Sequence, residues 1–355
     1  MWHFICPLHY ITIFYKMETF FITTTKEESE NQNLTNMQVL LPKLLASNGL
    51  IGTQMLNLWE GEVSDGFKIG DGSESFPYLI STGDELAYLA EQVNAGNTYS
   101  GIYFQLAADI DLNGKNWTPI GNGSNSFRGI FDGAGHTIAN GVISITNTNN
   151  NVEDYGFFGT IGGGNTQTII RNVEFNNIKV DFNVTRTISS NSYGYKIGVV
   201  TGAIYNNSEI TNVSVKNSQI IHNGTITAAY SSGWGSTTYY APILFVGGIA
   251  GDAVYSSSNE SNTGTYSIDY CFSDVDISLN VTTNNTGWGW GTTTPILCLG
   301  QINIGGIIGR IKSQNTWPTN SLYTGTITAS STNNANGLVG PIFGADRNTT
   351  GYNST

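Results

Sequence analysis

The chain has 355 residues, which is enough for one large domain or two smaller ones. Its net charge is −12 with a pI near 4.6, and lysine and arginine never cluster. This charge argues against a nucleic-acid partner and against binding to an anionic membrane surface, because both need a basic face. Aromatic residues reach 12%, so the composition differs from that of a disordered chain.

Residues 1–56 carry no pattern of a folded domain. "MWHFICPLHYITIFYK" is apolar but lacks a basic start, and the following "TTTKEESENQNLTN" is polar. The run from Met37, "MQVLLPKLLASNGLIG", has the form of a weak export signal, and a start codon assigned too far upstream explains the segment equally well. We expect 1–56 to be a poorly structured segment outside the fold. No apolar run reaches the ~18 residues of a transmembrane helix.

Residues 57–125 are predicted to form an N-terminal cap with the first strands. "FPYLIS" and "YFQLAADIDL" have the composition of strands, and a helix is predicted between them over 82–96. Thr82 with Glu85 forms a capping box, and Gly96 ends the helix. One apolar stripe follows helical spacing: Leu86, Leu89, Ala90 and Val93.

Residues 126–355 repeat one glycine-rich unit. Its variants are "YGFFGTI", "IGVVTGAI", "VGGIAGDA", "IGGIIGRI" and "NGLVGPI", and the first four are each followed by a second alternating apolar segment. We take Gly159, Gly202, Gly251, Gly309 and Gly340 as their closing glycines. A phosphate-binding loop occurs once, before a helix, whereas this unit recurs and no helix follows it. A recurring short-strand unit predicts a solenoid whose glycines serve tight corners or close backbone approach.

In this solenoid we expect one set of apolar residues to point inward: Ile110, Val173, Val213, Ile249, Cys271 and Ile307.

The insertions between units also resemble one another. "NGTITAAYSSGWGSTTYYAPILFVGGIAG" and "NVTTNNTGWGWGTTTPILCLGQINIGGIIG" share Gly-Trp-Gly and Pro-Ile-Leu, and "TRTISSNSYGYKIGVVTG" is a shorter version. They should leave the same corner of successive coils, which would bring their aromatic residues together. These are the candidate ligand-binding residues: Tyr193, Tyr195, Trp234, Tyr239, Tyr240, Trp288 and Trp290.

The five glycine units resemble the GLUG motif of large bacterial surface proteins, such as adhesins of the filamentous haemagglutinin type and streptococcal IgA-protease precursors. "PYLISTGDELAYLAEQVNAG", "YFQLAADIDLNGKNWTPIG" and "FRGIFDGAGHTI" are similar to the N-terminal cap and first coils of such proteins. The resemblance runs from about Trp59 to about Arg347. It implies an all-β fold, a right-handed parallel β-helix with a helix-containing cap, and it implies no single activity.

Other candidate sites have structural interpretations that we favour. "DIDLNG" begins like a calcium loop, with Asp109, Asp111 and Asn113 as weak ligands, but its twelfth position is Ile120 and not an acid. His136 is expected to tie the first coil to its cap. The three cysteines include no C-x-x-C pair, so we expect neither zinc nor any other cofactor.

Asp269, Asp274 and Asp276 are the most enzyme-like group, because β-helix hydrolases place acids on one outer face. No lysine or arginine lies beside them, and we read them as solvated acids. The chain also lacks H-E-x-x-H and G-x-S-x-G protease signatures.

We therefore expect a non-catalytic, extracellular or cell-surface protein that acts in adhesion or glycan binding, with host or matrix glycans as partners. Two alternatives remain: a polysaccharide lyase or glycoside hydrolase on the same fold, and a purely structural stalk. The sequence ends at "GYNST" soon after the last unit, which predicts a truncated C-terminal coil that associates with other copies.

Overall fold

The computed structural model describes residues 2–6, 9–16, 19–24, 58–145, 154–189, 194–230, 238–253, 265–282, 286–287, 297–311, 317–332 and 336–346. The chain divides into two compact units, Met1–Leu56 and Asn57–Thr355. Across the described ranges, no helix is long and apolar enough to cross a membrane.

The first unit contains an antiparallel sheet in the order β1-β2-β3, formed by Trp2–Cys6, His9–Lys16 and Thr19–Thr24. This differs from the poorly structured segment expected over 1–56. The physical reason is local, because these segments are dense in Ile, Thr, Phe and Tyr, which favour strands.

In the second unit, the predicted helix is confirmed as α2 (Gly83–Asn94). Thr82 Oγ1 accepts a hydrogen bond from the Glu85 N–H at 3.3 Å, and the Glu85 carboxylate accepts one from the Ser81 N–H at 2.8 Å. Gly96 has a φ of 110° just past the helix end, a conformation that favours glycine. The predicted apolar stripe is buried, with Leu86, Leu89, Ala90 and Val93 all at most 2% exposed.

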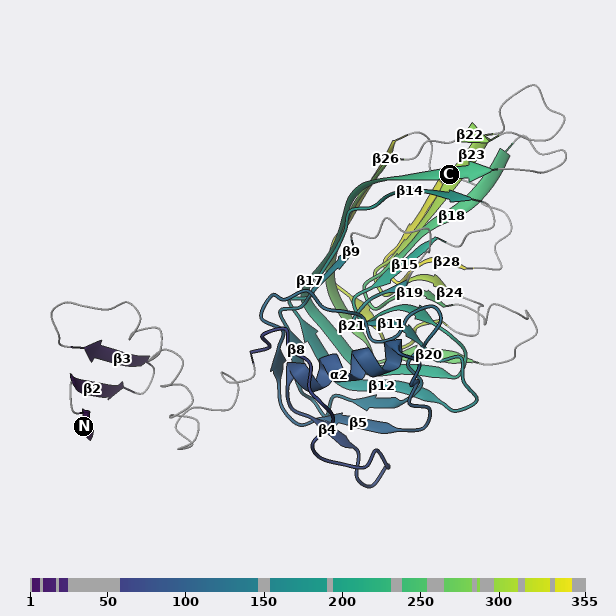
Figure 1. Cartoon of the computed structure of the whole chain (residues 1–355). Helices are drawn as coiled ribbons and strands as arrows, with labels where there is room; N and C mark the ends of the chain where they lie inside the picture. The colour runs from purple at the N-terminus through teal and green to yellow at the C-terminus, as the bar shows by residue number, and fades with distance from the viewer. Residues whose placement is uncertain are drawn as a thin grey trace. The chain divides into compact units, whose positions relative to one another are not determined.

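The rest of this unit is built from parallel sheets, so the expectation of an all-β fold is confirmed (Figure 1). One five-stranded sheet has the order β10-β15-β18-β23-β27: Asp154–Tyr155, Tyr195–Gly198, Thr238–Gly247, Leu297–Gly305 and Asn336–Gly340. A second has the order β11-β16-β19-β24-β28: Phe158–Ile161, Thr201–Ile204, Ala250–Ala253, Ile308–Ile311 and Phe343–Asp346. We call these the first and second small sheets.

The large sheet has 15 strands. Its main path is β25-β21-β17-β12-β7-β5-β4: Leu322–Tyr323, Phe272–Thr282, Ser208–Tyr230, Thr168–Asn176, Ile130–Asp132, Tyr103–Leu106 and Tyr78–Ile80. The strands that pair beside this path are β6, β8, β9, β13, β14, β20, β22 and β26: Ile110–Asp111, Thr137–Ala139, Val142–Ile145, Lys179–Phe182, Thr185–Ser189, Tyr266–Asp269, Thr286–Gly287 and Ile327–Thr332.

From β10 onward the chain visits the sheets in a fixed order: first small sheet, second small sheet, large sheet. We call one such passage a round. β10, β11 and β12 belong to one round and β15, β16 and β17 to the next, and each new strand pairs in parallel with its counterpart in the previous round. In the first part of the unit α2 alone connects β4 to β5, which are themselves parallel neighbours in the large sheet. The helix therefore stands where later rounds have strands of the small sheets.

The core runs through the inside of this stack. All six residues predicted to point inward are buried, with exposures between 0% and 3%, which confirms that prediction: Ile110, Val173, Val213, Ile249, Cys271 and Ile307.

The closing glycines of the repeat allow the two small sheets to approach each other. A Cβ added at Gly202 would lie 2.3 Å from the Tyr155 backbone nitrogen, and one at Gly251 would lie 2.3 Å from that of Ile197. One prediction was wrong here. β23 aligns Gly305 with Gly340, so the partner of Gly309 in the last round is Gly344. The last unit, "NGLVGPIFG", contains Gly340 and Gly344 four residues apart, and we assigned the first of them as the closing glycine.

Asparagines form ladders along the turns of the large sheet. Asn172 and Asn212 both have positive φ, and the Asn212 Nδ2 donates to the Asn172 Oδ1 at 2.8 Å. Asn177 and Asn140 repeat this arrangement at another turn, with a distance of 2.7 Å. Asparagine tolerates this backbone conformation better than most residues do, which accounts for part of the chain's high asparagine content.

Candidate functional site

The structure removes one residue from the aromatic set predicted to bind ligand. Tyr195 lies in β15 and is 1% exposed, so its ring belongs to the core and offers no face to a ligand. The strand register places it there, because Tyr195 aligns with Leu244, which is fully buried.

The rest of the aromatic set lies partly or wholly outside the described residues. Tyr239 and Tyr240 lie in β18, but their side chains are not described. Tyr193, Trp234, Trp288 and Trp290 lie outside the described residues.

The strands that flank the tryptophan-bearing insertions are in register. Before the insertions, Ala229 and Tyr230 in β17 align with Thr286 and Gly287 in β22. After them, β18 pairs with β23 from Thr238↔Leu297 onward. The two insertions therefore begin and end at neighbouring positions, about 4.8 Å apart in the pairing direction. Figure 1 shows these strands extending away from α2 at one end of the unit.

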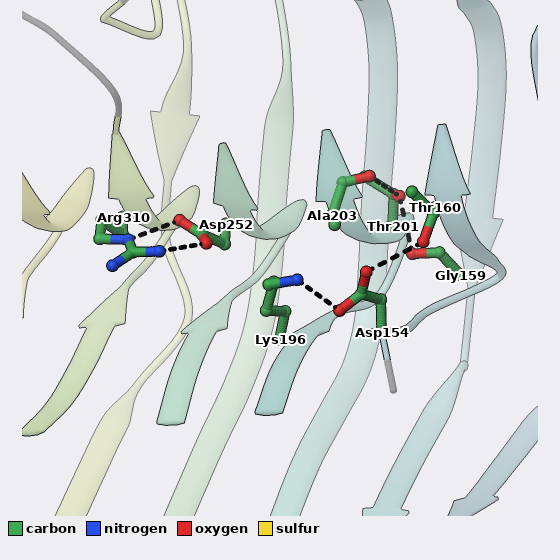
Figure 2. Close-up of polar contacts among 8 residues, drawn as sticks. All are labelled: Asp154, Gly159, Thr160, Lys196, Thr201, Ala203, Asp252 and Arg310. Carbon is green, nitrogen blue, oxygen red and sulfur yellow. Dashed lines mark hydrogen bonds and ion pairs between the residues drawn. The ribbon is translucent and has the colours of Figure 1, made fainter. Parts of the chain in front are cut away.

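Four charged side chains of the two small sheets form a row across successive strands (Figure 2). They are Asp154, Lys196, Asp252 and Arg310. The Lys196 Nζ lies 2.8 Å from the Asp154 Oδ1, and these side chains are 8% and 3% exposed. The Arg310 Nε and a terminal nitrogen both donate to the Asp252 carboxylate, which is fully buried.

The strand register creates this row. Asp154 aligns with Lys196 across β10 and β15, and Asp252 aligns with Arg310 across β19 and β24. Each charge therefore meets the opposite charge from the next round. Arg310 also lies over the Phe245 ring, 3.9 Å from its centroid, which favours a guanidinium through cation–π attraction.

A repeat-level signal could have identified this row, although sequence reasoning missed it. Asp154 and Lys196 each stand two residues before a glycine of their unit, and Asp252 and Arg310 each follow a closing glycine. Opposite charges at equivalent positions of successive units indicate pairing between rounds.

The electrostatics of the row favour a structural role. Burial by itself lowers the pKa of Lys196, but the carboxylates of Asp154 and Asp252 outweigh it and raise the pKa above its ordinary value. The lysine therefore stays protonated at neutral pH and cannot serve as a nucleophile or a base. The second oxygen of Asp154 accepts a hydrogen bond from the Thr160 hydroxyl at 3.0 Å, as Figure 2 shows.

The calcium candidates hold hydrogen bonds to neighbouring turns. The Asp109 Oδ1 lies 3.0 Å from both the His136 Nδ1 and the Thr137 N–H, so His136 joins its turn to the segment just before β6. Asp111 accepts hydrogen bonds from the Asn113 N–H and from the Asn140 side chain. Among the described residues, no group of three acidic, histidine or cysteine side chains has the geometry of a metal site.

The three outer-face acids also bond between rounds. The Asp269 Oδ1 accepts hydrogen bonds from the Thr319 hydroxyl and the Asn320 amide, each at 2.8 Å. The small burial of this carboxyl raises its pKa, but these hydrogen bonds have the larger combined effect and lower it. Asp274 and Asp276 accept hydrogen bonds from Thr324 and Thr326 in the same way. The acids therefore join the round that contains β25 and β26 to the round before it.

Comparison with known protein families gives no match. Over 102 residues the chain is 35% identical to a protein of Evansella cellulosilytica named "Putative Gly-rich membrane protein". That match covers 27% of this chain and 11% of the other, so the chain spans only a small part of this relative's length. A solved structure described as "a putative immunoglobulin A1 protease from Bacteroides ovatus" is 19% identical, with a TM-score of 0.36, and covers 79% of this chain and 87% of its own.

Proposed function

We propose that the protein is a secreted or cell-surface scaffold that binds glycans without catalysing a reaction on them. Its architecture in this proposal is a right-handed parallel β-helix capped by α2. The fixed order of the sheets and the parallel pairing of successive rounds support the β-helix architecture. Parallel strands joined by a crossover connection are right-handed in nearly all proteins, which supports the handedness.

The observation that carries glycan binding is the register of the strands around the two tryptophan-bearing insertions. β17 with β22 and β18 with β23 bring the ends of both insertions to adjacent positions. Trp and Tyr present flat faces that stack on sugar rings, and a flanking glycine leaves such a ring unobstructed. Neighbouring rings on successive rounds would bind a polymer with avidity.

The contacts of five acids favour this proposal over a glycoside hydrolase. Most glycoside hydrolases use a pair of carboxyl groups facing the substrate. Asp154 and Asp252 instead face cations inside the protein, and Asp269, Asp274 and Asp276 accept hydrogen bonds from the next round. A structural stalk is the second candidate, because these bonds between rounds stiffen the solenoid without any ligand.

The test replaces Trp288 and Trp290 together by alanine in the full chain. We expect retention on immobilised chitin, cellulose or mucin to fall at least tenfold while the melting temperature barely changes. Trp317→Ala is the matched control, because Trp317 is 49% exposed and lies outside the insertions. A lower melting temperature with unchanged retention would mean that the rings pack on the solenoid. If the wild type is retained on none of the three surfaces, glycan binding is wrong and the structural stalk is the better proposal.

A further inference from the structure

One turn of the large sheet recurs with a positive φ in four successive rounds. The residues just before this turn align from round to round, from Arg171 to Thr319. The residues that follow them therefore occupy equivalent positions, with φ values of 54°, 51°, 50° and 46°: Asn172, Asn212, Tyr270 and Asn320. Asparagine tolerates this backbone conformation, whereas it is strained for a residue as bulky as tyrosine.

Side-chain packing does not offset the strain at Tyr270. This residue is 63% exposed, so most of its ring surface is accessible from solvent. Tyr99 is the contrasting case, because it has a φ of 55° but its ring packs edge to face on Phe104, with centroids 5.1 Å apart. Backbone strain of this kind clusters at sites where a side chain has to be presented to a ligand.

Tyr270 also interrupts the asparagine ladder of this turn. The Asn212 Nδ2 donates to the Asn172 Oδ1 in the round before, but Tyr270 has no amide that could continue this series in the round after. Among the described residues, no group donates to the Asn212 Oδ1. An exposed amide oxygen is thereby left one round from the tyrosine, a spacing of about 4.8 Å.

The carboxylate next to the ring provides a second acceptor. The Asp269 Oδ1 accepts hydrogen bonds from the Tyr270 N–H, the Thr319 hydroxyl and the Asn320 amide. No described residue donates to the other oxygen, Oδ2, which is therefore free to accept. The residues aligned with Asp269 in the adjacent rounds are Thr211 and Thr319, so neither supplies a positive charge. This setting opposes an anionic ligand and suits a neutral one that carries hydroxyl donors.

We propose that Tyr270, Asp269 and Asn212 form a binding site for a neutral saccharide at this turn of the large sheet. A sugar ring stacks a C–H face on the phenol ring, and its hydroxyls donate to the carboxylate and to the amide oxygen. Protein-docking surfaces have an apolar centre, whereas the neighbours of this ring are polar. The ligand class rests on the proposed function, but the site uses none of the residues of the insertions.

The test is Tyr270→Asn in the full chain. The melting temperature should rise, because asparagine relieves the strained φ and can donate to the Asn212 Oδ1. Retention on immobilised cellulose or chitin should nevertheless fall about fivefold, because the stacking surface is lost. A gain in stability together with a loss of retention cannot result from unfolding.

Two further variants are the controls. Tyr270→Phe keeps both the ring and the strain, so retention and melting temperature should stay close to those of the wild type. Phe76→Asn removes an aromatic residue that is 50% exposed in the cap, and it should leave retention unchanged.

The outcomes separate this site from the insertions. Unchanged retention of Tyr270→Asn overturns the proposal, and if the Trp288 and Trp290 double variant then loses retention, the proposed function stands without this site. Loss of retention in Tyr270→Asn but not in the double variant supports the turn and contradicts binding by the insertions. Stronger retention of the wild type on alginate, an anionic polysaccharide, than on cellulose or chitin would also overturn the proposal, because Asp269 repels its carboxylates.

Discussion

At the scale of single residues, the burial of His222 has a free-energy cost that depends on pH. It is 1% exposed, and its ring stacks on Phe182 with centroids 4.3 Å apart. Its Nδ1 donates to the Phe182 carbonyl, while its Nε2 is buried without a hydrogen-bond partner. Burial lowers the pKa of His222, and the hydrogen bond to Phe182 opposes this shift only in part. The imidazole therefore stays neutral in the folded protein.

His222 should make the protein sensitive to acid. The pKa of His222 in the folded protein lies below the unfolded value of about 6.5. Its contribution to the free energy of unfolding is therefore fully present above pH 6.5 and decreases as the pH falls toward the folded pKa. In that window the free energy of unfolding should fall by up to about 1.4 kcal/mol per pH unit through this residue. We expect His222→Leu to remove this part of the pH dependence, since Leu279 occupies the aligned position of the next round. Urea denaturation at pH 7 and pH 5 measures it, and equal pH dependence in both proteins would contradict the assignment.

At the scale of elements, the glycine column sets the distance between the small sheets. Gly202, Gly251 and Gly309 each place their missing side chain against the backbone of the first small sheet, where an added Cβ would lie between 2.3 and 2.6 Å from a backbone nitrogen. None of these three has a positive φ. Close approach, and not backbone conformation, is what requires glycine at these positions.

Gly251→Ala should therefore destabilise the protein by about 1–3 kcal/mol or more, because backbone atoms on the facing sheet cannot move aside. Gly123→Ala is the control, since an added Cβ there meets nothing within 4 Å. That change should be neutral or stabilising by up to about 1 kcal/mol. Chemical denaturation of both variants distinguishes them, and similar stabilities would mean that the small sheets can separate locally.

At the scale of the whole unit, the last round leaves apolar surface uncovered within the described residues. Val339 in β27 is 56% exposed, although it aligns with Ile304, which is fully buried one round earlier. Leu322 in β25, which belongs to the round before the last, is 57% exposed. Exposed strand edges of this kind pair readily with other chains.

We therefore expect the 355-residue chain to associate at high concentration. Val339→Lys should shift it toward monomer, because a charge at an open edge opposes pairing. Phe76→Lys, which changes a residue that is 50% exposed in the cap, should leave association unchanged. Sedimentation velocity over a concentration series measures this. A wild type that stays monomeric throughout would show that the edge is protected.

The sequence predicted the features that depend on short-range patterns. The capping box at Thr82 and the apolar spacing of α2 are local, so the helix was predicted to within two residues at its C-terminal end. Alternation within a strand likewise identified Val173 and Val213 as inward residues. These patterns succeed because a helix turn or a strand pleat fixes the side-chain direction within a few residues.

The tertiary structure decided what depends on register between rounds. Asp252 and Arg310 are 58 residues apart in the chain, and only the pairing of β19 with β24 brings them together. The same holds for Gly344 as the partner of Gly309 and for the burial of Tyr195. Insertions of variable length separate the repeats, so spacing along the chain does not determine which residues become neighbours. Backbone pairing and side-chain packing across the stack determine it.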